Sequence, residues 1–334
     1  MNQFPPSEYV HSSCLPGLEL MLQHGLLSLD RPYTAASEQS MWNEQGKLGL
    51  IPDTLTTTTF AVAESKVDEA SPMPSLVSSW NAQAKQAVQF DQDGYVIFLD
   101  LGGRRLHRGY PCSIPDTIGT FSRLATLNVA GSDLPLPNIL EILRQPNLPE
   151  TLECLYLGGN GLGDEGIAAI ATEFLSRSQK LIKLDLRYND IQAKGMTVLC
   201  HELSPTALKH LYLEGNQVGN QGAAALAKLL EEQSSCDDDM GLREVFLGAN
   251  RIESEGANCL AQSLYKNKKL SKLYLEGNNI GLEGANAFST VLEELKGNTS
   301  LKNLYVDNNT IGKEGSKRLA NALNSDTAIG ESII

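Results

Sequence analysis

The sequence has no apolar segment long enough to cross a membrane. A transmembrane helix needs about 18 or more consecutive apolar residues, and no stretch of the 334 residues approaches that length. Residues 1–8 also lack the basic and apolar regions of a secretory signal. We therefore expect a cytoplasmic protein that does not bind a membrane.

Basic residues are scarcer than acidic ones, and the cysteines are scattered. Lys and Arg number 27 against 40 Asp and Glu, a net charge of −13. This balance disfavours binding to nucleic-acid phosphates and favours a protein partner with a basic surface. The six cysteines form no C-x-x-C pair and have no histidine at metal-ligand spacing. We expect reduced thiols, no metal and no cofactor.

Catalytic motifs are also lacking. The five histidines form no H-x-x-H array, and no Ser or Cys lies in a nucleophile-elbow sequence. Residues 161–166 fit G-x-G-x-x-G, but the glycines fall on positions of a repeat and Leu162 on a core position, so we interpret the match as coincidence. Residues 237–239 are aspartates without the alternating ligand spacing of an EF-hand, which is typical of a solvated loop. The sequence predicts no catalytic residue and no enzyme.

What the sequence does contain is an internal repeat. From residue 152 the pattern Leu-x-x-Leu-x-Leu-x-x-Asn-x-apolar occurs six times. The asparagines of the six copies are Asn160, Asn189, Asn216, Asn250, Asn278 and Asn309. Two weaker copies precede them, with Arg104 and Ser132 at the asparagine position, so we count eight repeats over residues 96–334.

Each part of the repeat predicts a local structure. The Leu-x-Leu alternation has the period of a strand with one buried face. The asparagine can bond backbone groups that the following turn leaves unpaired. A glycine six residues after each asparagine lets a helix begin close to its neighbour. Because one unit cannot bury its own apolar face but a stack can, we predict an α/β solenoid with a parallel sheet on the concave face and helices on the convex face.

This pattern resembles the ribonuclease-inhibitor-like class of leucine-rich repeats, which also occurs in NOD-like receptors and in the Ran GTPase-activating protein. The resemblance implies a horseshoe that binds another protein. Residues Ile114 and Pro115 resemble the turn of plant-type repeats, which usually lack a full helix, so we expect helices from the third repeat onward. In the Ran GTPase-activating protein an arginine after an early strand is important for catalysis. Arg104 and Arg105 occupy a comparable loop, so the resemblance leaves open a GTPase-activating protein for a small GTPase.

The N-terminal part of the chain carries no repeat. Residues 1–75 are rich in threonine and polar residues, and we expect them to be largely disordered. Residues 76–95 are predicted to form an N-terminal cap, with a helix over 77–90 that includes Trp80 and covers the first repeat.

The residue between the two leucines of each strand faces the concave surface. In the later repeats it is usually aromatic, and the spacing of about 4.8 Å between strands predicts a continuous stripe. The predicted partner-binding residues are Tyr156, Asp185, Arg187, Tyr212, Glu214, Phe246, Tyr274, Glu276, Tyr305 and Asp307. Two interpretations stay open: the rings only pack on one another, or they anchor a partner. We favour a monomeric, non-enzymatic interaction scaffold.

Overall fold

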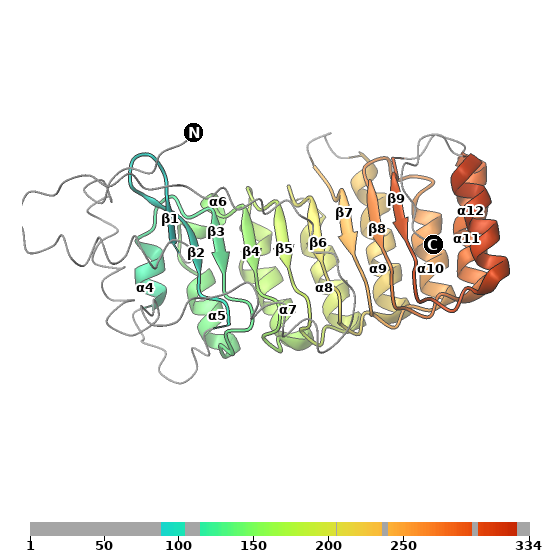
Figure 1. Cartoon of the computed structure of the whole chain (residues 1–334). Coiled ribbons are helices and arrows are strands. Elements are labelled where there is room, and N and C mark those ends of the chain that lie inside the picture. The colour runs from blue at the N-terminus through green and yellow to red at the C-terminus, as the bar shows by residue number, and fades with distance from the viewer. Residues whose placement is uncertain (1–87, 104–113, 205, 236–239, 296–299, 326–334) are drawn as a thin grey trace, which may run out of the picture.

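The computed structural model describes residues 88–103, 114–204, 206–235, 240–295 and 300–325. Residues 1–75, most of the predicted cap and the segment with Arg104 and Arg105 lie outside these ranges. Within them the chain forms one elongated stack, with a sheet on one side and helices on the other (Figure 1).

The sheet contains nine strands in sequence order. They are β1 (Val88–Phe90), β2 (Val96–Asp100), β3 (Thr126–Asn128), β4 (Cys154–Tyr156), β5 (Lys183–Asp185), β6 (His210–Tyr212), β7 (Glu244–Phe246), β8 (Lys272–Tyr274) and β9 (Asn303–Tyr305). Strands β2 to β9 pair in parallel, with the central leucine or valine of each strand beside that of the next. The eight predicted repeat strands and their register are confirmed.

The ninth strand corrects part of the predicted cap. Residues 88–90, expected at the end of a helix, form β1, which pairs antiparallel with β2. Asp91 turns the chain between the two strands, because its Oδ1 accepts backbone N–H bonds from Asp93 and Tyr95. Strand β1 therefore covers the edge that β2 would otherwise expose.

Helices lie on one side of the sheet along the whole stack (Figure 1). They are α4 (Ile114–Gly119), α5 (Leu136–Leu143), α6 (Leu148–Thr151), α7 (Gly163–Glu173), α8 (Ala193–Leu203), α9 (Gly219–Glu232), α10 (Ser254–Ser263), α11 (Gly281–Leu295) and α12 (Gly312–Ser325), with short 3₁₀ turns η4 (Leu175–Arg177) and η5 (Gln233–Ser235). The expectation of helices only from the third repeat is wrong, since α4 and α5 belong to the first two. They are short: α5 ends at Leu143, shortly before Pro146, and proline disfavours helix at and before its own position.

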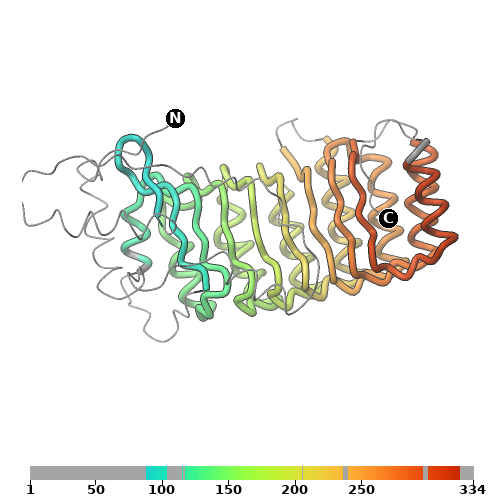
Figure 2. The backbone as a smooth tube through the Cα atoms, in the orientation of Figure 1, coloured from blue at the N-terminus to red at the C-terminus, as the bar shows by residue number. Residues whose placement is uncertain are grey.

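The curvature follows from the two layers. Adjacent strands are about 4.8 Å apart, whereas packed helices need about 8–10 Å between their axes. A stack that alternates the two must bend with the sheet on its inner side. The backbone trace in Figure 2 shows the two layers running side by side along the molecule. The outward-facing strand residues therefore line the concave face.

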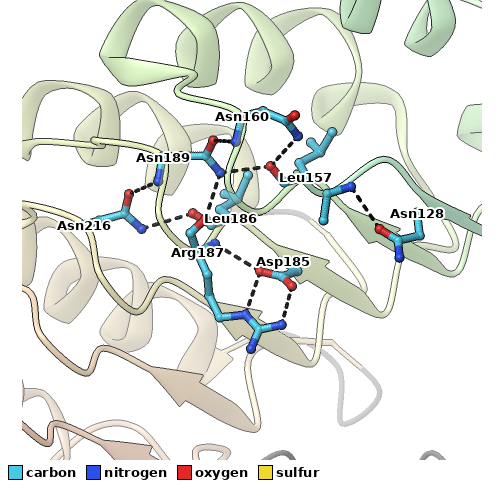
Figure 3. Close-up of polar contacts among 9 residues, drawn as sticks. Asn128, Leu157, Asn160, Asp185, Leu186, Arg187, Asn189 and Asn216 are labelled. Carbon is cyan, nitrogen blue, oxygen red and sulfur yellow. Dashed lines mark hydrogen bonds and ion pairs between the residues drawn. The ribbon is translucent and has the colours of Figure 1, made fainter. Parts of the chain in front are cut away.

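The repeat asparagines form a ladder behind the concave face (Figure 3). The buried Asn189 donates through Nδ2 to the backbone oxygens of Leu157 (3.0 Å) and Arg187 (3.2 Å). Its Oδ1 accepts from the backbone N–H of Asn160 (3.1 Å). Asn216 does the same for the backbone N–H of Asn189, at 3.0 Å. The predicted role of these asparagines in pairing turn backbone is confirmed, and the ladder fixes the loops that follow the strands.

Candidate partner-binding face

The structure brings four of the predicted aromatic residues together on the concave face. The ring centroids of Tyr212 and Phe246 are 4.4 Å apart, those of Phe246 and Tyr274 4.1 Å, and those of Tyr274 and Tyr305 4.4 Å. Neighbouring planes differ by 13°, 12° and 7°. The four residues are register partners across β6 to β9, so strand pairing itself sets the spacing. We call these four residues the aromatic stack.

Burial differs along the aromatic stack. Phe246 is only 5% exposed, since a ring covers it on each side. The three tyrosines are half-buried. A partner would therefore meet mainly the ring edges and hydroxyl groups of the tyrosines, with Phe246 holding them in line.

Tyr156 does not join the aromatic stack. Asp185 is its register partner on β5 and separates it from Tyr212. Asp185 is 3% exposed and binds the Arg187 guanidinium through two hydrogen bonds, Nε to Oδ1 at 3.0 Å and Nη2 to Oδ2 at 2.6 Å (Figure 3). Asp185 thus has an internal role: it orients Arg187, which lies 5.6 Å from the centre of the Tyr212 ring at the end of the aromatic stack.

The acidic residues beside the aromatic stack carry less charge than the sequence suggests. Burial raises the pKa of Glu214 to about 8 and that of Glu276 to about 7. Glu276 raises the pKa of Glu214 further, and Asp307 does the same for Glu276. The expected row of three carboxylates is therefore, near neutral pH, a row in which two members are largely or partly protonated.

The opposite side of the aromatic stack is a paired charge cluster. Glu244 Oε1 lies 2.9 Å from Lys272 Nζ, and Glu244 Oε2 lies 3.2 Å from His210 Nδ1. The hydrogen bond from His210, with that from Lys272, lowers the pKa of Glu244 to about 2 against the effect of burial. Glu244 is therefore ionised, and its two oxygens are paired with Lys272 and His210. The two sides of the aromatic stack thus differ in how many hydrogen-bonding atoms remain available to a partner.

Tyr188 is a residue of this face that sequence reasoning missed. Its side chain is 38% exposed, its φ is +53°, and its ring lies against Gly215. A positive φ is costly for a bulky residue. The repeat pattern marks this position, because the residue before each of the six repeat asparagines has a positive φ. At that position the other five repeats from residue 152 onward have Gly159, Gly215, Ala249, Gly277 and Asn308.

Two further observations bear on other kinds of site. Among the described residues no group of three His, Cys, Asp or Glu side chains has the arrangement of a metal site. In the same part of the chain no helix has the length and apolar character of a membrane span. Arg104 and Arg105, the basis for the alternative of a GTPase-activating protein, lie outside the described residues.

Comparison with known proteins identifies the repeats. Residues 149–171, 177–200, 205–227 and 266–289 match a family described as Leucine Rich repeat. Ribonuclease inhibitor of Sus scrofa is 31% identical over 173 residues, which cover 52% of this chain and 37% of the relative. The chain carries leucine-rich repeats that are similar to those of the ribonuclease inhibitors.

Other relatives share the same repeats. Ribonuclease inhibitor of Mus musculus is 30% identical to this leucine-rich-repeat protein over 59% of the chain and 42% of the relative. Human NACHT, LRR and PYD domains-containing protein 3 is 30% identical over 43% of the chain and 14% of the relative. The chain thus spans less than half the length of these relatives. A solved structure of the Leiomodin-1 actin-binding site 2 aligns with a TM-score of 0.39 and 15% identity over 48% of this chain and 87% of that chain.

Proposed function

We propose that this leucine-rich-repeat protein is a non-enzymatic scaffold that binds a protein partner on its concave face, centred on the aromatic stack. The proposal takes the protein as a cytoplasmic monomer and the partner as a protein with a basic surface. The observation that carries it is the row of three tyrosines and Phe246, held in register by strand pairing at positions where the leucine core does not need them.

Tyrosine suits such a surface for physical reasons. It offers a large amphipathic contact area with few rotatable bonds, so little entropy is lost when a partner binds. Stacking restricts the rings before binding, which reduces that loss further. The relatives support a binding role, because the name ribonuclease inhibitor describes a protein that acts on another protein.

Charge favours a basic partner. The net charge of −13 attracts a basic protein over distance and acts mainly on the association rate. Close to the face, Asp307 adjoins the Glu276 side of the aromatic stack. We expect binding to weaken as salt rises, because exposed charges are screened over about 8–10 Å.

The test is affinity capture from native lysate with the full chain and two variants. Tyr274→Arg changes the concave face, and Lys228→Glu changes a side chain on α9 that is 79% exposed on the convex face. Circular dichroism establishes that both variants fold. A protein retained by the native chain and by Lys228→Glu, but not by Tyr274→Arg, supports the proposal. Equal retention by all three, or loss with Lys228→Glu alone, overturns it.

A further inference from the structure

Two glutamate side chains converge over a glycine beside the aromatic stack. Gly248 follows β7, and its neighbours in the adjoining loops are Glu214 after β6 and Glu276 after β8. A Cβ at position 248 would lie 3.5 Å from Glu214 Cγ and 3.8 Å from Glu276 Oε2. Gly248 is itself buried, so the two side chains close over it from opposite sides.

One oxygen of the Glu214 carboxyl group lacks a hydrogen-bond donor among the described residues. Its Oε2 is buried and accepts no hydrogen bond from any residue that the structure describes. A buried acceptor without a donor is unfavourable. The guanidinium of Arg187 is near enough to lower the pKa of Glu214, and its Nε and Nη2 donate to Asp185.

The groups around Glu214 and Glu276 give the two carboxyl groups a mostly negative environment. The titratable and charged groups that face Glu214 and Glu276 are Asp185, Arg187, Tyr188, Tyr212, Tyr274 and Asp307. Only one of them, Arg187, is positive. The pair therefore lies in a negative, partly desolvated environment in which a proton or another cation is needed for neutrality.

We propose that Glu214 and Glu276 form a clamp for one lysine side chain of the bound partner, whose ε-ammonium enters between the two carboxyl groups over Gly248. This inference rests on the proposed function, since it names the group by which a basic partner would be held on the concave face. An ammonium is a compact point charge with three donors, and it can bond both carboxylates at once.

Binding of the lysine ammonium group releases protons from the two carboxyl groups. In the free protein the carboxyl groups are largely or partly protonated near pH 7, because burial raises both pKa values, Glu276 adds to the rise at Glu214, and Asp307 adds to the rise at Glu276. When the ammonium enters with its three protons, the carboxyl protons leave to solvent and two charge-assisted hydrogen bonds replace them. Lysine binding is therefore coupled to proton release and strengthens as the pH rises from about 6 to 8.

A metal ion is a weaker fit for the same pair. Two carboxyl groups supply few of the six to eight oxygen ligands that calcium takes, and no third acidic, histidine or cysteine ligand completes a group in the described part of the chain. Calcium chloride is therefore included in the test as a competing occupant.

The test follows the ¹³Cδ resonances of Glu214 and Glu276 in the full chain during a pH titration. The probe is Nα-acetyl-lysine methylamide, with tetramethylammonium chloride of equal ionic strength and calcium chloride as separate arms. We expect the lysine probe to move both carboxyl midpoints down by about one unit, saturably, while tetramethylammonium does not. No movement, equal movement with tetramethylammonium, or movement with calcium alone overturns the clamp.

The variant Gly248→Lys places a lysine side chain of the protein itself beside the two glutamates. Repeat neighbours carry Arg187, Glu214 and Glu276 at the position of Gly248, Gly248 has no positive φ, and a Cβ there would make only ordinary van der Waals contacts. Gly248→Lys should lower both midpoints without any probe and abolish the response to it. Gly248→Met, of similar length without charge, is the matched control, and equal effects of the two variants contradict the proposal.

The clamp and the proposed function can fail separately. If partner capture depends on Tyr274 but the lysine probe leaves both glutamates unchanged, the concave face binds a partner and the clamp is wrong. If the probe moves both midpoints but capture is insensitive to Tyr274→Arg, the clamp stands and the aromatic stack is not the docking centre.

Discussion

The rings of Phe246 and Tyr274 stack face to face, with centroids 4.1 Å apart and planes inclined by 12°. Tyr274 also stacks on Tyr305, so one residue makes two ring contacts. Since an aromatic pair is worth about 0.5–1.5 kcal/mol beyond its buried area, Tyr274→Ala should lower the free energy of unfolding by about 1–3 kcal/mol. Tyr274→Phe keeps both stacks and should cost much less. Denaturant unfolding of the two variants measures the difference.

The same substitution separates packing from binding. If Tyr274 anchors a partner, Tyr274→Ala should weaken binding of that partner by about 2 kcal/mol. Tyr156→Ala, outside the aromatic stack, is the control on the same face. Isothermal titration at a temperature where all variants are folded gives the affinities. A loss of stability with unchanged affinity would mean that the aromatic stack serves packing alone.

The asparagine ladder should be a large contributor to stability. Asn189→Ala removes the hydrogen bonds to Leu157 and Arg187 and leaves the backbone N–H of Asn160 without that acceptor. Unpaired buried groups cost about 1–3 kcal/mol each, so we expect a loss of about 2–5 kcal/mol in urea unfolding. The exposed Asn258→Ala on α10 is the matched control and should change stability by less than about 0.5 kcal/mol. A loss of similar size in the control would refute the special role of the ladder.

The core register makes a separate prediction. Leu226 on α9 and Leu260 on α10 are fully buried between the helices and the sheet. Leu226→Ala or Leu260→Ala should therefore destabilise the protein by about 2–5 kcal/mol. A loss below about 1 kcal/mol in denaturant unfolding is incompatible with the helix register described above.

Glu214 should make stability depend on pH. Its pKa rises from an ordinary value near 4.5 to about 8 on folding. Between these values the folded state binds more protons than the unfolded state, so stability falls as the pH rises through the window. Glu214→Gln removes this group from the titration. Relative to the native chain, the variant should gain thermal stability at pH 9 but not at pH 4.

The control for this titration is Glu255→Gln on α10, where the side chain is exposed. It should leave the difference between pH 4 and pH 9 unchanged. A Glu214→Gln variant that melts in parallel with the native chain across this range would show that the Glu214 carboxyl group is ionised normally.

Much of this architecture is predictable because the repeat is local. The leucines fix the buried face of each strand, and equal register then places Tyr212, Phe246, Tyr274 and Tyr305 side by side. Repetition makes each inference independent of distant contacts, so the number of repeat strands, their parallel direction and the aromatic stripe follow from the pattern alone.

The features that the sequence did not predict are ones that the repeat does not determine. Strand β1 lies outside the repeat, and its antiparallel pairing depends on the turn built around Asp91. The raised pKa of Glu214 cannot be inferred from the repeat, because it depends on burial beside Gly248 and on Glu276 in the next two repeats. The sequence suggests that Asp185 is an exposed acid, but in the structure it is buried and paired with Arg187.

The most direct test of the binding role is site-specific photo-crosslinking in cells. A benzoylphenylalanine replaces Tyr305, which ends the aromatic stack in β9, or Lys228 on the convex face. The account predicts that the probe at position 305 forms a discrete adduct with a partner protein and that the probe at position 228 does not. An adduct at position 228 with none at 305 would contradict binding on the concave face.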